Sequence, residues 1–245
     1  MTRFTDCAHN ILFRLDRAKW LSDMAVSSRA SIVGYSEADS HKARRVLTQH
    51  CRDTGRGLFD PVHCGNPISW DSKVWTPIPK ESGVVEVHRR VNIPRVKFNP
   101  ARDFAWVGLE HNVCGTKVLR INVHPIAGAT KPEPNKYGPR LNEWKDWAVR
   151  QYWLDVVSFT AAQMSREKWD VILLGGDFNG RLENRREWWY PGPLLSSLYF
   201  TDDAPRSIDR LVWTRDSLVR QEKRWVVAKG IHSDHHLHFA EYVTT

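Results

Sequence analysis

The sequence predicts an α/β fold in which strands and helices alternate early and antiparallel strands are inserted in the middle of the chain. Two observations support this prediction. Strand-like apolar segments at 3–11 and 31–35 are followed by helix-like segments near 14–28 and 38–53. Residues 57–124 instead show one strand pattern after another, separated by short turns, which is typical of antiparallel pairing.

The helices are predicted from periodicity and from residues that suit helix ends. The second helix is expected to stop at Gly55. A long third helix is expected over roughly 140–166, with Pro139 suited to its first turn because proline needs no amide partner there. The first helix is predicted from apolar residues at helical spacing, namely Leu15, Ala18, Leu21, Met24 and Ala25.

The remaining strands are predicted from apolar and alternating segments. One hairpin is expected to join 104–113 to 116–124, turning at Cys114 and Gly115. Other strands are expected at 83–88, 170–175, 207–213, 223–228 and 237–243.

Residues 171–179, Val-Ile-Leu-Leu-Gly-Gly-Asp-Phe-Asn, are the most informative stretch. A continuous apolar run is typical of a buried parallel strand. Strand alternation would place Asp177 and Asn179 on one side and Phe178 on the other, and the two glycines would let another backbone or a substrate come close. A tight turn is the alternative, because Gly, Asp and Asn are common turn residues.

Several other predicted strands also carry an acid, amide or imidazole at one end. Each of these residues alone could be a cap, a turn or a solvated edge. Together they are more easily explained by one shared site at the carboxyl ends of the strands. They are Asn10, Glu37, Asn122 with His124, Asp209, and Asp234 with His235.

These residues, in this order, resemble the endonuclease/exonuclease/phosphatase superfamily, the group with the deoxyribonuclease-I-like fold. Gly-Asp-Phe-Asn at 176–179 and Ser-Asp-His at 233–235 are the most specific motifs, and the resemblance runs from about residue 3 to residue 243. It implies a four-layer α/β/β/α sandwich with two packed, mostly antiparallel mixed sheets flanked by helices. It also implies one catalytic domain over residues 1–245.

The resemblance further implies a Mg²⁺-dependent phosphodiesterase that directs water at a phosphate ester, with Mn²⁺ as a substitute ion. A hard divalent cation neutralises the phosphate and prefers oxygen ligands. Glu37 is the best candidate for a direct ligand, with Asn10 and Asp234 as further candidates. A helix first-turn acid is the simpler alternative for Glu37.

Roles for the other residues also follow from the resemblance. Asp177 would activate or position the water, and Asn179 would fix the water or the phosphate. His235 would contact the scissile phosphate, with Asp209 holding its tautomer. His235 as the base is an alternative that stays open. His124 would lie across the phosphate and protonate or hydrogen-bond the leaving oxygen.

Charge favours a polyanionic substrate, since the chain carries a formal net charge of +8. Asn122 is also expected to contact substrate. A solvated helix face is the simpler interpretation of the pair Arg44 and Arg45. The loop after the Asp-Phe-Asn motif provides further candidate substrate contacts, namely Arg181, Arg185, Arg186 and Trp188. For the aromatic residues of this loop, packing onto the body of the protein is the alternative.

We therefore favour a nuclease acting on DNA, with RNA as a second substrate. The alternative is a phosphatase or a lipid phosphodiesterase acting on phosphoinositides or sphingomyelin, and a third hypothesis is a non-catalytic binding protein.

Composition is that of a globular domain, with 41% hydrophobic and 26% charged residues. We expect a cytoplasmic protein, because no segment reads as a membrane span or signal peptide. We also expect a monomer. The four widely spaced cysteines suggest neither a zinc site nor a disulfide framework.

Overall fold

The computed structural model describes most of the chain, and the following account is limited to that part. The described residues are 1–11, 16–38, 40–61, 64–87, 103–125, 139–179, 200–201, 209–214, 218–227, 231–232 and 235–244, with the backbone alone at 139–150, 200–201 and 209–210.

The first sheet collects strands from both ends of the chain. Its order is β11-β12-β1-β2-β4-β3. β1 and β2 run parallel, and every other neighbouring pair in this order is antiparallel. The strands are β1 (Arg3–Asn10), β2 (Ile32–Ser36), β3 (Arg56–Phe59), β4 (Ile68–Asp71), β11 (Val219–Val227) and β12 (Leu237–Thr244).

The second sheet is built from the middle of the chain, in the order β5-β6-β7-β8-β10-β9. Here β7 and β8 are the parallel pair, and the other pairs are antiparallel. The strands are β5 (Trp75–Glu86), β6 (Asp103–His111), β7 (Lys117–Val123), β8 (Val171–Asp177), β9 (Phe200–Thr201) and β10 (Asp209–Thr214).

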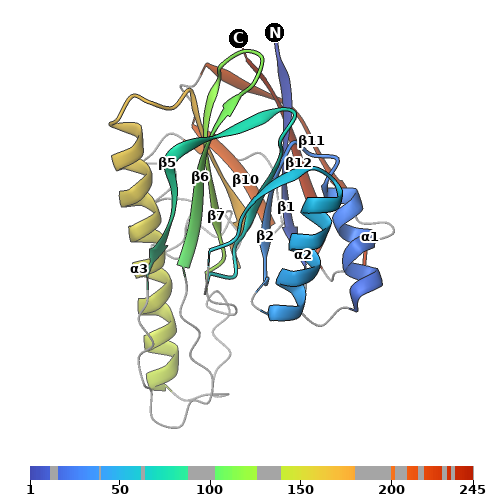
Figure 1. Cartoon of the computed structure of the whole chain (residues 1–245). Helices are drawn as coiled ribbons and strands as arrows, with labels where there is room; N and C mark the ends of the chain where they lie inside the picture. Colours follow the sequence, from blue (N-terminus) through green and yellow to red (C-terminus); the bar gives the residue numbers. More distant parts are fainter. Residues whose placement is uncertain are drawn as a thin grey trace.

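Helices cover the outer face of each sheet (Figure 1). α1 (Arg17–Ser27) and α2 (His41–Asp53) lie on one side of the molecule, and α3 (Pro139–Met164) lies on the other. Asp16 caps α1 by accepting from the Lys19 amide at 2.9 Å. Ser40 caps α2 by accepting from the Ala43 amide at 3.0 Å, which satisfies an otherwise unpaired donor.

Three apolar layers hold the four structural layers together, which confirms the predicted α/β/β/α sandwich. One layer packs α3 residues such as Tyr152 and Trp153 against β7 and β8. A second packs α1 and α2 against β1, β2 and β12. The third lies between the sheets and includes Phe4, Trp75 and Tyr242. Burial of both strand faces explains the continuous apolar runs of β7 and β8.

Most of the expected elements are present, with three differences. The predicted strands at 83–88 and 223–228 are parts of the longer edge strands β5 and β11. The predicted first helix is present, but only Met24 and Leu21 of its predicting residues pack on the core, whereas Ala18 and Ala25 are exposed and Leu15 lies outside the described residues. The buried residues of α1 are Trp20, Asp23, Met24 and Ser27.

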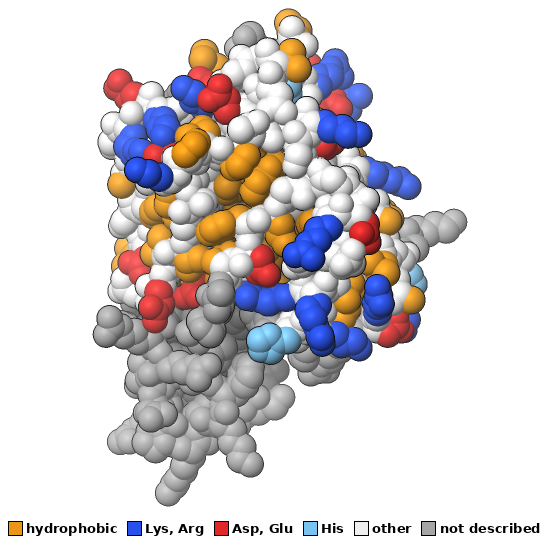
Figure 2. Space-filling view, in the orientation of Figure 1, with side chains coloured by type: hydrophobic (Ala, Val, Ile, Leu, Met, Phe, Trp, Pro, Cys, Tyr) orange, Lys and Arg blue, Asp and Glu red, His pale blue; other side chains and the backbone are white. Residues whose placement is uncertain are grey.

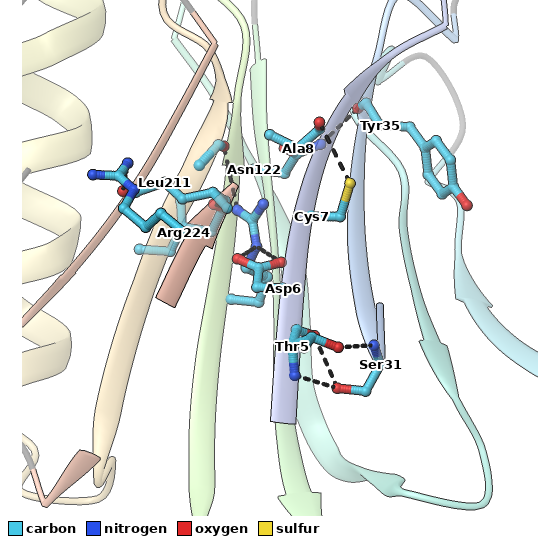
Figure 3. Close-up of polar contacts among 12 residues, drawn as sticks. Thr5, Asp6, Cys7, Ala8, Ser31, Tyr35, Asn122, Leu211 and Arg224 are labelled. Atoms are coloured by element: carbon cyan, nitrogen blue, oxygen red, sulfur yellow. Dashed lines mark hydrogen bonds and ion pairs between the residues drawn. The ribbon is translucent and has the colours of Figure 1, made fainter. Parts of the chain in front are cut away.

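Polar bridges cross the apolar layer between the sheets (Figure 3). Asp6 of β1 pairs with Arg120 of β7, with Asp6 Oδ2 2.9 Å from Arg120 Nε, and both side chains are 0% exposed. Arg224 of β11 donates to the Leu211 carbonyl of β10 at 3.0 Å. These contacts fix how one sheet lies over the other, because a buried charge is tolerated only where its partner is in place.

No helix in the described part of the chain is long and apolar enough to cross a membrane. All four cysteines are free thiols, with Cys7, Cys51 and Cys64 buried and Cys114 exposed.

A buried histidine makes the stability of the fold depend on pH. His9 is 1% exposed, its Nδ1 lies 3.0 Å from Ser27 Oγ, and burial lowers its pKa from 6.5 to about 3. Between pH 6.5 and about 3, His9 binds a proton in the unfolded chain but stays neutral in the folded chain. Stability from neutral His9 is thus complete above pH 6.5 and is lost as the pH falls toward about 3.

We predict that the unfolding free energy of the wild type falls more steeply between pH 6.5 and 4.5 than that of His9→Gln, by up to ~1.4 kcal/mol per pH unit. Denaturant titration at each pH measures this difference. His41→Gln, at an exposed histidine, is the matched control and should follow the wild-type slope. Equal slopes for His9→Gln and wild type would contradict the assignment.

Candidate active site

Two parallel strand pairs bring their carboxyl ends to one edge of the sandwich. In the first sheet Asn10 of β1 lies beside Ser36 of β2, and in the second Val123 of β7 lies beside Gly176 of β8. Parallel strands end together, so the residues at or just after these ends become neighbours across the two sheets. This edge is the lower edge of the sheets in Figure 1.

Asp177, the last residue of β8, is at the centre of the cluster. Its side chain is 2% exposed, and its Oδ2 accepts from Asn10 Nδ2 at 3.1 Å. The same oxygen lies 3.7 Å from His124 Nε2 and 3.8 Å from His235 Nδ1. One carboxylate oxygen therefore faces an amide and two imidazoles that come from three separate segments of the chain.

Glu37 joins the same cluster from the end of β2. Asn10 Nδ2 lies 3.4 Å from Glu37 Oε1, so one amide group contacts both carboxylates. Glu37 Oε2 is buried and has no hydrogen-bond partner among the described residues. A buried carboxylate oxygen without a donor is costly, and this one is placed where a cation could satisfy it.

Among the described residues, two of the four non-glycine residues with a positive φ lie at the cluster, and the other two, Lys80 and Glu167, lie elsewhere. Glu37 has a φ of 62° and Asn179 a φ of 50°, in the left-handed region that residues with a side chain seldom adopt. Such strain is retained where the surrounding structure holds it and is frequent at functional sites.

Arg44 provides much of the support around Glu37. From α2 its guanidinium donates to the carbonyls of Ala38 at 3.1 Å and Pro61 at 2.9 Å, and it also contacts the Cys64 carbonyl. Arg44 Nη2 lies 3.4 Å from Asp60 Oδ1, and the Arg44 side chain is 17% exposed. The simpler interpretation of a solvated helix face is therefore wrong for Arg44, whereas Arg45 is exposed as expected.

The Asp-Phe-Asn segment is both a strand end that presents Asp177 to the cluster and a tight turn, the two interpretations that the sequence left open. Asp177 Oδ1 accepts from the Asn179 amide at 2.8 Å, which is a side-chain turn, while Oδ2 faces the cluster. Phe178 is 2% exposed and its ring lies 5.0 Å from that of Trp153. β8 ends at Asp177, so strand alternation does not extend to Asn179, whose Nδ2 donates to the Pro125 carbonyl at 2.9 Å.

Gly176, directly before Asp177, allows a close backbone approach, as predicted. Gly176 has a φ of 133°, and a Cβ there would lie 2.1 Å from the Val123 carbonyl oxygen. Any side chain at this position would push β8 away from β7 and displace Asp177.

Asn122 is near the cluster but behind it. Its side chain is 0% exposed and donates to the Tyr35 carbonyl at 2.6 Å, across the gap between the sheets (Figure 3). This hydrogen bond joins β7 to β2, and the expected substrate contact of Asn122 stays a prediction.

Some predicted site residues cannot be placed fully. Asp209 lies opposite Asp177 in the register of β10 and β8, which brings its backbone to the cluster, and its side chain is outside the described residues. Also outside the described residues are Asp234, Arg181, Arg185, Arg186 and Trp188.

Three supporting residues were not anticipated. Ser36 Oγ lies 3.4 Å from the Asp177 amide and accepts from it, and Tyr152 of α3 accepts from the His124 amide at 2.9 Å. Arg44 is the third. Ser36 directly precedes Glu37, which is a weak signal, whereas nothing in the local sequence distinguishes Tyr152 from an ordinary core residue.

The cluster offers few protein ligands for a divalent cation, and Mg²⁺ needs only one or two. No group of three or more His, Cys, Asp or Glu residues suited to a metal occurs within the described part of the chain. Mg²⁺ keeps several waters and is usually held by one or two carboxylates, so Glu37 with its unpaired Oε2 fits this ion. The histidines near the C-terminus, at 232–238, do not form a transition-metal site in the described residues, because His232 pairs with Asp23 at 2.9 Å and His236 is exposed.

No protein-family model matches the chain, and no curated protein matches it. Solved structures do match. An endonuclease/exonuclease/phosphatase family protein from Bacteroides thetaiotaomicron has a TM-score of 0.68 at 14% identity, covering 100% of this chain and 98% of that chain. A mannosyl-6-phosphatase from the same organism has a TM-score of 0.66 at 14% identity, with 98% and 99% covered.

The human Nocturnin catalytic domain with bound sulfate anion has a TM-score of 0.69 at 13% identity, covering 99% of this chain and 95% of that chain. At these identities the comparisons show the fold. The resemblance to the endonuclease/exonuclease/phosphatase superfamily is therefore confirmed as a shared fold over the whole length.

Proposed function

We propose that this chain is a Mg²⁺-dependent phosphodiesterase that hydrolyses nucleic acid, with DNA as the first substrate to test and RNA as the second. The observation that carries the proposal is the convergence on Asp177 of Asn10, His124 and His235, with Glu37 beside Asn10. Carboxylates, an amide and imidazoles around one point are suited to a phosphoryl group and its attacking water.

Mg²⁺ is the ion whose chemistry suits the oxygen donors. Glu37 Oε2 would be its direct ligand, with Asn10 nearby and Asp234 as a further candidate. When bound, Mg²⁺ would neutralise phosphate charge and polarise a phosphate oxygen, and Mn²⁺ could replace it.

The protein side chains would orient the water and move its proton. Asp177 is placed to accept a hydrogen bond or a proton from the water, since its Oδ2 faces the cluster. His235 is the second candidate base and could instead contact the phosphate. His124 would donate a proton or a hydrogen bond to the leaving oxygen, and Asn179 would fix the water or the phosphate. The Asn179 backbone amide also donates to Asp177 Oδ1 at 2.8 Å.

Charge favours a polynucleotide over a small ester. The net charge of +8 suits a polyanion, whose phosphates release counterions when lysine and arginine neutralise them. A phosphatase is the second candidate, because a mannosyl-6-phosphatase shares the fold over the whole chain.

We predict that wild-type protein cleaves DNA in Mg²⁺ or Mn²⁺ but not in EDTA, and that Asp177→Asn lowers the rate by about 10²–10⁴-fold because the proton acceptor is lost. A panel of plasmid, oligonucleotide, RNA and sugar phosphate measures activity and substrate class. The control is Asp170→Asn, at the opposite end of β8, where the carboxylate accepts from the Lys117 amide at 2.7 Å.

Asp170→Asn should remain within about threefold of the wild-type rate, because removal of one hydrogen bond far from the cluster affects stability more than chemistry. An Asp177→Asn variant as active as Asp170→Asn would remove Asp177 from the mechanism. Turnover of sugar phosphate with intact nucleic acid would favour the phosphatase.

We also predict that Arg44→Gln weakens Mn²⁺ binding by about 10-fold or more, because the loop that holds Glu37 loses its support. Calorimetric titration of the protein without substrate measures this affinity. Arg45→Gln removes the same charge from the next, exposed position and should bind Mn²⁺ as the wild type does. Equal affinities for the two variants would show that Arg44 does not position Glu37.

A further inference from the structure

The outer surface of α2 carries a row of cations. Lys42, Arg45 and Arg52 are exposed and lie at helical spacings of three and seven residues, so they share one face of the helix. The opposite face packs into the core through Ala43, Val46, Leu47 and Cys51. Figure 2 shows Lys and Arg side chains gathered over α1 and α2, at the lower right of the view.

These cations differ from many others in the described part of the chain, which are neutralised by a carboxylate. Arg3 pairs with Glu222 and Glu241, while Arg166 and Lys168 both pair with Glu81. Within the described residues, Lys42 and Arg45 form no ion pair. Lys42 instead lies 5.5 Å from the centre of the Trp20 ring of α1, which holds its ammonium at the surface between the two helices.

The first turns of α2 lie beside the candidate active site. Lys42 follows Glu37 by five residues, so their Cα atoms are at most about 18 Å apart. The bond from Arg44 to the Ala38 carbonyl, at 3.1 Å, ties this part of α2 to the residue next to Glu37. The positive end of the helix dipole adds to the same field.

We propose that Lys42 and Arg45 bind the phosphate backbone of a polynucleotide beside the scissile bond, on the Glu37 side of the site. This inference rests on the proposed function for its substrate class. It predicts that affinity for a long polyanion depends on the two cations, whereas turnover of a small phosphodiester, which reaches only the catalytic cluster, does not.

Two other exposed cations, Arg29 and Lys73, serve as a control for Lys42 and Arg45, because they lie near the opposite end of β2. Arg29 precedes β2 by three residues, and Lys73 follows Asp71, whose amide donates to the Ser31 carbonyl at 2.8 Å. Both are exposed and form no ion pair among the described residues. β2 separates the two edges by about 13 Å, which exceeds the screening length of about 8 Å in physiological salt.

The experiment compares K42Q/R45Q with R29Q/K73Q, which remove the same charge. Binding of a fluorescent 20-nucleotide DNA strand is measured by anisotropy in EDTA between 50 and 200 mM salt, and circular dichroism checks folding. For K42Q/R45Q the slope of log affinity against log salt should become shallower by about 1.4, as expected for two lost phosphate contacts on a single strand. R29Q/K73Q should keep the wild-type slope.

A second measurement follows hydrolysis of bis-p-nitrophenyl phosphate in Mg²⁺, where both double variants should match the wild type. Equal DNA-binding slopes for the two variants, or equal loss in both, would overturn the inference even if the protein cleaves DNA. A slope that depends on Lys42 and Arg45 in a protein that never cleaves DNA would keep the inference and refute the proposed function.

Discussion

The candidate site depends on how two sheets from different parts of the chain are aligned, and the buried Asp6–Arg120 pair sets this alignment. Arg120 of β7 pairs with Asp6 of β1 and also donates to the Gly175 carbonyl of β8 at 3.2 Å, two residues before Asp177. Burial raises the pKa of the Asp6 carboxyl, and the Arg120 guanidinium opposes that rise. Removing one partner of such a pair costs about 3–5 kcal/mol, so alignments that separate them are strongly disfavoured. Asn122, bonded to Tyr35 at 2.6 Å, adds a second link nearer the site.

The site itself carries backbone strain and an unsatisfied carboxylate oxygen. Glu37 is held at a positive φ, and its Oε2 is buried without a donor among the described residues. Both features cost free energy in a protein without ligands, and Arg44 compensates by fixing the backbone at Ala38, Pro61 and Cys64. A cation at Glu37 would recover part of that cost. This is the pattern expected of a site that is organised before its ligand arrives.

The sequence predicted the core of the fold and the centre of the site, because both depend on patterns that are local. Buried strands β7 and β8 read as apolar runs, and Gly175-Gly176-Asp177 marks the end of β8. The edge strands β5 and β11 were underestimated, since an edge strand is half exposed and β5 also contains Pro77. Arg44 and Tyr152 could not be predicted, because their partners are distant backbone groups that only the folded chain brings near. The link from Asn122 to Tyr35 could not be predicted either, because the position of Asn122 in the sequence does not reveal its burial.

The central claim is that Asn10, Glu37, His124, Asp177 and His235 surround one cation-bound phosphate. The most direct measurement is anomalous diffraction from crystals soaked with Mn²⁺ and a nucleoside monophosphate. The account predicts a Mn²⁺ peak about 2.1 Å from Glu37 Oε2, with a phosphate oxygen on the ion and the phosphate between His124 and His235. A Mn²⁺ peak elsewhere, with Glu37 Oε2 still uncoordinated and the phosphate away from both histidines, would contradict it.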